Sequence, residues 1–301
     1  MRKVLVVCGT TASGKTGFAV EVAKRLGGEV ISADCMLVYR GLNIGTAKPT
    51  ESEKQGIKHY MIDVVSPKDP FSVSDYEQMA YPILQRLQEQ SIPTVLCGGT
   101  GFYLQSLCFL RSFGSAQKND AIRAKYEQLA DSCGNDALHA VLEKVDPQSA
   151  KILHPNDRKR VIRALEIYEL TGRKKSDQQD NIIPRIPYLA VAFAYERSVL
   201  YDRINRRVVE MLAMGLVDEV RDLLKAGVQE NDQCMQGIGY KEVVQYLKNR
   251  ISHSTMLEII QKNTRNYAKR QITYFNKFPN LIWLDPDDRN NVERVLELMH
   301  E

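Results

Sequence analysis

Short runs of apolar residues, many of them β-branched, alternate along the chain with longer segments in which apolar residues recur every three or four positions. Short uninterrupted runs are typical of strands buried on both faces of a parallel sheet, whereas the longer period is typical of helices. The alternation predicts an α/β fold, a parallel sheet flanked by helices on both faces. The strand-like runs occupy residues 3–8, 29–34, 59–64, 93–101, 186–195 and 281–285.

A glycine-rich turn follows the first run and leads into "TGFAVEVAKRL" (16–26). In that segment Phe18, Val22 and Leu26 are four positions apart, so they share one face of a helix. The helix is expected to end at Gly27, because glycine readily adopts the left-handed conformation that closes helices.

The pattern changes in the middle third of the chain, where three charged helical stretches follow one another with no strand between them. This predicts an all-helical insertion domain at 116–181, placed within a core that is formed by 1–115 and 182–301. Three further amphipathic helices are expected at 198–226, 240–249 and 254–278.

Composition narrows the class of protein. The net charge of +4 is mild and reports on solubility more than on fold. The six cysteines include no C-x-x-C pair and the five histidines no H-E-x-x-H, which argues against a zinc site and fits buried thiols in a reducing cytosol. The apolar run after Arg2 and Lys3 is too short for a signal peptide or a membrane span. We therefore expect a soluble, cytoplasmic protein, and a monomer because no long apolar stripe is left unexplained.

The glycine-rich turn matches the phosphate-binding pattern G-x-x-x-x-G-K-[ST] and stands in its proper context of strand, loop and helix. Successive backbone N–H groups and the helix N-terminus form an anion-binding nest, to which a lysine adds a cation and a threonine hydroxyl can add a ligand for Mg²⁺. The pattern predicts a P-loop core of the nucleotide-kinase type. The motif specifies a polyphosphate. ATP binding is indicated by the motif alone. The residues concerned are Gly9, Thr10, Thr11, Ala12, Ser13, Gly14, Lys15 and Thr16.

Asp34 closes the second predicted strand, and the carboxyl ends of parallel strands meet at one edge of the sheet. A carboxylate there can hold Mg²⁺ through water or act as a general base. An aspartate that only caps a turn is the simpler alternative. Arg203 and Arg207 share one face of a predicted helix and suit a phosphate clamp, although a solvated helix face would also explain them.

Two segments combine basic and aromatic residues, 156–175 and 262–275. Cations meet phosphates and aromatic rings stack on bases, so such segments favour a nucleic-acid surface. For either segment alone a solvated face is an equal explanation, but two on one chain favour nucleic acid.

Taken together, these strings resemble those of the tRNA dimethylallyltransferases, the isopentenyltransferases that modify the adenosine next to the anticodon. They stand in the family's order and span nearly the whole chain. The matching strings are "GTTASGKT" (9–16), "ISADCMLVYRGLNIGTAKP" (31–49), "HYMIDVVSP" (59–67), "CGGTGFYL" (97–104), "LHPNDRKRVIRALEI" (153–167), "LYDRINRRVVEML" (200–212), "GIGYKE" (237–242) and "NYAKRQITYF" (266–275).

The resemblance implies a reaction in which the dimethylallyl group of dimethylallyl diphosphate passes to the exocyclic amine of the adenosine 3′ of the anticodon, with release of diphosphate. It implies that Asp34 accepts the amine proton and that Thr11, Lys15 and Arg207 act on the diphosphate, with Mg²⁺ near Thr16. The helical insertion would contact the anticodon stem-loop. The implied tRNA contacts are Asp34, Cys35, Met36, Leu37, Thr100, Arg123, Lys159, Arg160, Val161, Ile162 and Arg163.

The sequence departs from the family pattern at several positions. Thr10 replaces a usual proline, Cys35 a common serine and Leu37 a frequent glutamine, so two side chains lose hydrogen-bonding groups near the adenine. The stretch 109–119 lacks the usual proline and acidic residues, which weakens the expected contact of Arg123. No C-terminal zinc-finger extension of the eukaryotic kind is present, which points to a bacterial-type enzyme.

Three alternatives remain at this point. A P-loop kinase for a nucleotide or small metabolite would use the same fold, but the chain lacks a recognisable arginine-bearing lid motif. A prenyltransferase acting on free AMP or ADP would not need the helical insertion or the basic segments. A non-catalytic RNA-binding protein would not need Lys15, Thr16 and Asp34 together.

Overall fold

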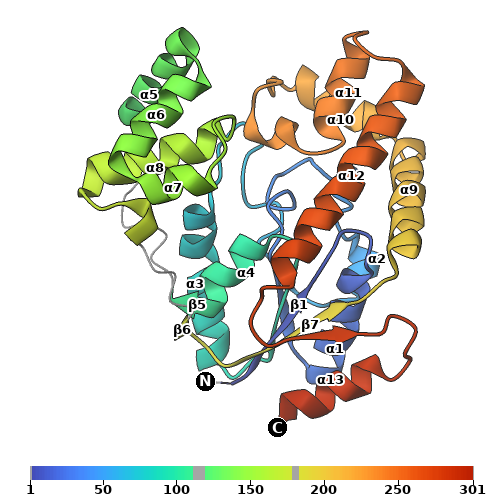
Figure 1. Cartoon of the computed structure of the whole chain (residues 1–301). Helices are drawn as coiled ribbons and strands as arrows, with labels where there is room; N and C mark the ends of the chain where they lie inside the picture. The colour runs from blue at the N-terminus through green and yellow to red at the C-terminus, as the bar shows by residue number, and fades with distance from the viewer. Residues whose placement is uncertain (1, 111–118, 178–182, 301) are drawn as a thin grey trace. The chain divides into compact units, whose positions relative to one another are not determined.

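The computed structural model describes residues 2–110, 119–177 and 183–300. The chain divides into two compact units (Figure 1), a core unit formed by 1–109 and 184–301 and a helical unit formed by 110–183. The boundaries expected at 115/116 and 181/182 lie outside the described residues.

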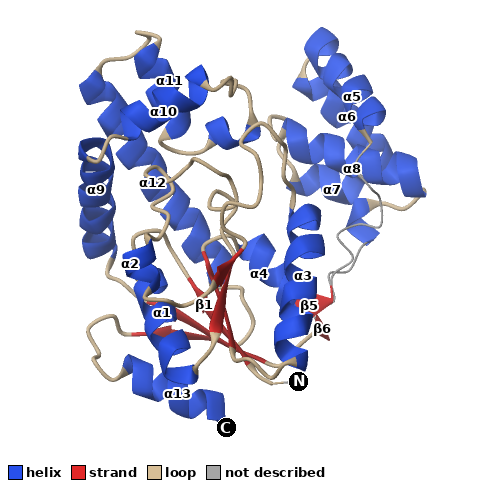
Figure 2. Cartoon of the chain, turned by 180° about the vertical axis from the view of Figure 1, so that it is seen from behind, coloured by secondary structure: helices blue, strands red, loops and turns tan. Residues whose placement is uncertain are grey.

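Six parallel strands form the central sheet of the core unit in the order β3-β2-β4-β1-β7-β8. The central strand β1 pairs with β4 on one side and β7 on the other, so that Val6 lies beside Leu96 and Ala190. The predicted α/β fold with a parallel sheet is confirmed (Figure 2). The strands are β1 (Val4–Cys8), β2 (Glu29–Ser32), β3 (His59–Tyr60), β4 (Thr94–Gly98), β7 (Tyr188–Phe193) and β8 (Leu281–Leu284).

Helices cover both faces of this sheet. Alternate residues of each strand point to opposite sides, so each face has its own apolar cluster. Leu5 and Val7 pack in a cluster with residues of α1 (Lys15–Leu26) and α13 (Asn291–His300). Val4, Val6 and Cys8 join the larger cluster on the other face, with residues of α3 (Val73–Glu89), α4 (Gly101–Cys108) and α12 (His253–Phe275). No helix in the described parts of the chain has the length and apolarity needed to cross a bilayer.

Two predicted elements differ from the structure. The expected helix at 198–226 is two helices, α9 (Arg197–Ala213) and α10 (Leu216–Lys225), because Gly215 adopts a φ of 103° that no continuous α-helix contains. The strand expected at 59–64 is only two residues long, since Met61 and Asp63 have positive φ values and leave the extended region. The remaining helices of the core unit are α2 (Glu51–Lys54), η2 (Gln233–Gln236) and α11 (Tyr240–Leu247).

The helical unit contains four α-helices within its described residues, one more than the pattern predicts. The additional helix begins at Pro147, which suits a first helical position, and Asp146 caps it by accepting from the Ser149 amide at 3.1 Å. Leu138 and Val161 are fully buried in the core of this unit. Where the chain enters and leaves the unit it forms the two-stranded sheet of β5 (Phe109–Leu110) and β6 (Ile183–Pro184). The helices are α5 (Asp120–Cys133), α6 (Asn135–Val145), α7 (Pro147–Ile152) and α8 (Arg158–Thr171), followed by the 3₁₀ turn η1 (Lys175–Asp177).

Candidate active site

The P-loop connects β1 to α1 through three residues in unusual backbone conformations. Gly9, Ala12 and Gly14 have φ values of 132°, 61° and 82°. Gly14 is the N-cap of α1 and carries no side chain, so its backbone and the first amides of the helix stay accessible to an anion. The Lys15 Nζ donates to the Thr10 carbonyl at 2.9 Å, which folds this side chain back over the loop.

Two side chains, one just after β7 and one on α9, bind carbonyls of the loop. The Arg203 Nε donates to the Ala12 carbonyl at 2.8 Å, and the Tyr195 hydroxyl donates to the Ser13 carbonyl at 3.1 Å. The Arg203 guanidinium also lies 5.0 Å from the centre of the Tyr195 ring. Arg203 and Arg207 therefore have different roles. Arg203 binds the loop itself, whereas Arg207 lines two cavities that lie beside the loop.

Asp34 lies just beyond β2 at the start of a tight turn. Its Oδ1 accepts from the amides of Met36 at 2.8 Å and Leu37 at 3.4 Å. The turn is also held from the loop between β4 and α4, because the Cys35 amide donates to Thr100 Oγ1 at 3.0 Å. Asp34 therefore caps a turn, which is the simpler explanation of this residue. The capping uses one of its two carboxylate oxygens, Oδ1.

The ends of β2 and β4 approach each other so closely that only glycine fits at Gly98. A Cβ at that position would lie 2.1 Å from the Ala33 carbonyl oxygen. The Thr100 amide donates to the same carbonyl at 3.1 Å. The contact brings the loop between β4 and α4 against the aspartate turn.

Two cavities adjoin beside the P-loop, one of about 440 Å³ and one of about 90 Å³. The larger has a predominantly apolar wall, with Ile204 and Val208 from α9 and Ile260 from α12. The smaller is lined by Lys15 and Thr16, among others. Both cavities share the following lining residues, which mark their junction: Thr11, Asp34, Thr46, Arg207 and Tyr267.

Burial lowers the pKa of a cation at this junction and of one in the smaller cavity. Desolvation lowers the pKa of Lys15 and of Arg207, and in both cases the nearby Asp34 carboxylate opposes that shift. Burial raises the pKa of Tyr267, so its hydroxyl keeps its proton. A cation in a poorly solvated site gains more from an anionic ligand than an exposed one, so the junction favours a negatively charged group.

The smaller cavity also contains hydroxyl groups suited to a metal ion. Thr16 and Ser32 both line it, and the buried Ser32 Oγ has no hydrogen-bond partner among the described residues. The described residues contain no group of three or more His, Cys, Asp and Glu side chains that could hold a metal. Mg²⁺ commonly binds through few protein ligands together with phosphate oxygens and water, and this donor set fits that mode.

The opposite wall of the larger cavity is held by Glu219 on α10, a residue to which the sequence pattern assigns no role. Its carboxylate accepts from the amides of Asn43, Ile44 and Gly45 at 2.7–3.2 Å and from the Tyr240 hydroxyl at 2.7 Å. A Cβ at Gly45 would lie 2.6 Å from the Tyr240 ring. Tyr240 belongs to the string "GIGYKE". Its partners Glu219 and Gly45 lie about twenty and about two hundred positions away in sequence, so the string alone does not reveal these contacts.

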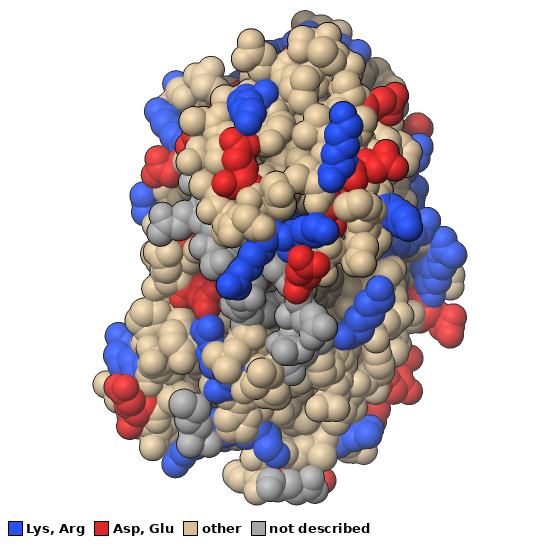
Figure 3. Space-filling model, turned by 60° about the vertical axis from the view of Figure 1, so that its left-hand side comes forward, with Lys and Arg blue, Asp and Glu red and all other residues tan. Residues whose placement is uncertain are grey.

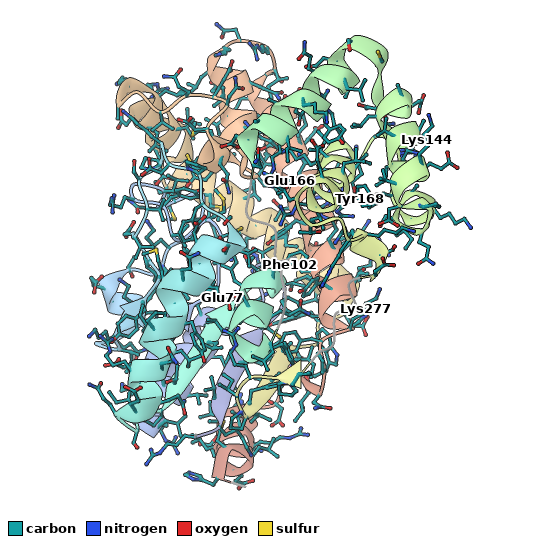
Figure 4. The ribbon with its side chains drawn as sticks, turned by 90° about the vertical axis from the view of Figure 1, so that its left-hand side faces the viewer. Glu77, Phe102, Lys144, Glu166, Tyr168 and Lys277 are labelled. Carbon is teal, nitrogen blue, oxygen red and sulfur yellow. The ribbon has the colours of Figure 1, made fainter. Side chains whose placement is uncertain are left out.

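In the helical unit a buried carboxylate organises two arginines. Glu166 on α8, labelled in Figure 4, accepts two hydrogen bonds from Arg123 at 2.8 and 2.9 Å and one from Arg163 at 2.5 Å. The Asn119 amide also donates to it at 2.8 Å. Burial opposes ionisation of Glu166, but these hydrogen bonds outweigh burial and lower its pKa to about 2. Both arginines are therefore bound in an internal ion pair.

The other candidate tRNA contacts on α8 divide by burial. The side chains of Val161 and Ile162 are 0% and 3% exposed within the core of the helical unit, so they offer no surface for side-chain contact. Lys159 and Arg160 are exposed, and Arg160 pairs with Asp157 at 3.2 Å. Charges of both signs are interspersed on the molecular face in Figure 3, so attraction for a polyanion depends on particular cations.

Comparison with known proteins identifies the family. Residues 37–278 match the family described as IPP transferase. A tRNA dimethylallyltransferase of Thermoanaerobacter sp. (strain X514) is 43% identical, over 97% of this chain and 95% of its own length. One from Acetivibrio thermocellus is 42% identical, over 99% and 96%.

Solved structures agree with this result. The tRNA isopentenylpyrophosphate transferase of Bacillus halodurans has a TM-score of 0.74 at 39% identity, covering 100% of this chain and 95% of its own. A eukaryotic dimethylallyltransferase captured in the crystal acting on tRNA has a TM-score of 0.84 at 28% identity, covering 98% and 78%. The chain therefore belongs to the IPP transferase family, with the tRNA dimethylallyltransferases, as its sequence strings predicted.

Proposed function

We propose that this protein transfers the dimethylallyl group of dimethylallyl diphosphate to the exocyclic amine of the adenosine 3′ of the anticodon in tRNA. The observation that carries the proposal is the junction of the two cavities, which joins a P-loop residue, Thr11, to Asp34 and Arg207. A phosphate-binding loop, a carboxylate and an apolar wall are the three surroundings that this reaction needs. The relatives' names supply the reaction class.

The diphosphate would be bound by backbone and hydroxyl groups of residues 9–16, other than the Thr11 amide, which donates to Gln271, with Lys15 and Arg207 as cations. As the allylic C–O bond breaks, negative charge builds up on the departing oxygen. Donors and cations already aimed at that oxygen stabilise the transition state more than the ground state. The apolar side chains of the larger cavity, such as Val208 and Ile260, would surround the five-carbon chain.

The adenine amine would attack the allylic carbon, so that a C–N bond forms while the C–O bond breaks. The nitrogen must lose one proton, and we assign its acceptance to Asp34. A neutral aromatic amine is a weak nucleophile, and removal of its proton during attack improves it. Thr100 and residues 35–37, which surround Asp34, would contact the extruded nucleotide.

Mg²⁺ would be held by the Thr16 hydroxyl, with the Ser32 hydroxyl in the same cavity. When bound, it would neutralise charge on the departing diphosphate. The protein groups of the P-loop would keep the diphosphate in place.

The helical unit would grip the anticodon stem-loop through exposed cations, of which Lys159 and Arg160 are the best placed. Extrusion of a loop base costs a few kcal/mol of unstacking, and phosphate contacts along the stem can offset it. We propose that one copy of the chain suffices for these contacts.

The proposal is tested by incubating the protein with radiolabelled dimethylallyl diphosphate, Mg²⁺ and unmodified tRNA. We expect label to enter a tRNA with adenosine 3′ of the anticodon, and no label to enter the same tRNA with guanosine there. Label entering AMP instead would favour the free-nucleotide prenyltransferase. Transfer of phosphate from ATP, without prenyl transfer, would favour a kinase.

The tRNA surface is tested by the double variant Lys159→Glu and Arg160→Glu. We expect a higher KM for tRNA, unchanged kcat, and a dependence of log KM on log salt that is shallower by about 1 for each lost contact. Lys151→Glu, on an exposed position of α7 in the same unit, is the control. If the double variant and the control have the same KM and salt slope, these two cations do not bind tRNA.

A further inference from the structure

One amide side chain joins the two loops of the candidate active site. Gln271 lies on α12 and is only 5% exposed. Its Oε1 accepts from the Thr11 amide of the P-loop at 2.9 Å, and its Nε2 donates to the Gly99 carbonyl, in the loop between β4 and α4, at 3.0 Å. Glutamine offers one acceptor and one donor group at its tip, which is what these two partners require.

The loop at 99–101 packs closely against α12. A Cβ at Gly99 would lie 2.4 Å from the Gln271 Nε2, and a Cβ at Gly101 would lie 2.0 Å from the Tyr274 ring. Tyr267, Gln271 and Tyr274 are four and three positions apart, so they occupy one face of the helix. Phe102, labelled in Figure 4, packs against the Tyr274 ring with a centroid distance of 5.5 Å.

The residue between these two glycines transmits the contact to the aspartate turn. Thr100 accepts from the Cys35 amide at 3.0 Å, and Asp34 is the residue before Cys35. A continuous set of hydrogen bonds therefore leads from Thr11 through Gln271 to the loop at 99–101, and from there to the turn that carries Asp34. The Thr11 amide is used within the protein, so α12 controls where the P-loop stands relative to Asp34.

We infer that Gln271 is a positioning residue that sets the alignment of the P-loop with Asp34, and thereby of the diphosphate with the group that accepts the amine proton. The inference rests on the proposed prenyl transfer. Gln271 also lines the smaller cavity, but both groups of its amide are bound to the protein, so it acts through Thr11 and the loop at 99–101. Its effect belongs to the chemical step, because a shift of about 1 Å between reacting groups can cost about 10²-fold in rate.

The test is Gln271→Met, which keeps the length of the side chain and removes both hydrogen bonds. We expect kcat, and with it the single-turnover rate constant of prenyl transfer, to fall by roughly 10- to 100-fold. The Kd for inorganic diphosphate by calorimetry and the KM for tRNA should stay within about twofold, since the groups that bind them remain. Gln261→Met is the matched control on the same helix, because Gln261 donates to the Asn205 carbonyl at 3.2 Å and lines neither of the two cavities. We expect it to leave kcat unchanged.

The variants Gly99→Ala and Gln271→Ala test the contact between Gly99 and Gln271, and they remain informative if Gln271→Met does not fold. Gly99→Ala places a methyl group against Gln271 and should lower kcat, whereas in a Gln271→Ala background the methyl group has room. We therefore expect the two effects to be strongly non-additive. A kcat within twofold for Gln271→Met, an equal loss of kcat and diphosphate affinity, or additive effects of Gly99→Ala and Gln271→Ala would overturn the inference. Absence of prenyl transfer by the unaltered protein would instead overturn the proposed function.

Discussion

Asp34→Asn is expected to lower the rate of prenyl transfer by about 10²- to 10⁴-fold, the usual contribution of a general base. An amide cannot take up the amine proton, but its oxygen can still accept from the Met36 amide, as Asp34 Oδ1 does at 2.8 Å. The turn should therefore remain folded. The measurement is single-turnover transfer at saturating tRNA, with the Kd for inorganic diphosphate determined in parallel, and this Kd should change little.

Asp34→Ala separates catalysis from capping of the turn. It removes the base and also the acceptor for Met36 and Leu37, so we expect the same loss of rate as for asparagine and an additional loss of stability of about 1 kcal/mol, typical of a lost side-chain cap. Thermal unfolding measures the second effect. If Asp34→Asn kept most of its rate and only Asp34→Ala lost it, Asp34 would be a structural residue and the assignment of the base would be wrong.

Arg207→Ala is expected to have the second largest effect, a fall in kcat of about 10²- to 10³-fold, the range found for removal of one preorganised donor to a developing anion. Arg207 is partly buried, and its desolvation lowers its pKa. A guanidinium in such surroundings stabilises departing charge strongly. Unlike the Asp34 variants, Arg207→Ala should also weaken the binding of inorganic diphosphate, since that ligand resembles the leaving group.

Arg207→Lys should recover only part of the rate, because lysine offers a point charge without the planar pair of donors. Arg197→Ala is the matched control at the exposed start of the same helix α9, and it should retain the activity of the unaltered protein. Equal activity of Arg207→Ala and Arg197→Ala would contradict a role of Arg207 at the leaving group.

Much of this architecture could be predicted from local patterns. The strand–loop–helix unit around residues 9–16 follows from an apolar run, two glycines and an amphipathic segment, which are all neighbours in sequence. The limits of this approach appear at Gly215, where a continuous apolar period hides a break with φ of 103°. Periodicity indicates which residues face inward. It does not reveal a break in a helix when the apolar spacing continues in phase beyond the break.

The candidate site could be predicted where its chemistry is carried by a motif. Lys15, Thr16, Asp34 and Arg207 belong to recognisable strings, and the structure brings all four to one pair of adjoining cavities. Gln271 belongs to such a string too, "NYAKRQITYF", but the string does not indicate its role. Its two partners, Thr11 and Gly99, are 260 and 172 positions away, so no local spacing relates them.

The sequence by itself determined the kind of fold, the phosphate-binding loop and the family, because each depends on short-range order along the chain. The tertiary structure decided which groups are free to act. It placed the side chains of Val161 and Ile162 in a core, paired Arg123 with the buried Glu166, and assigned Arg203 to a loop carbonyl while Arg207 lines the cavities. Burial and partnership are properties of contacts between distant segments, and together they decide which charges stay accessible to a ligand.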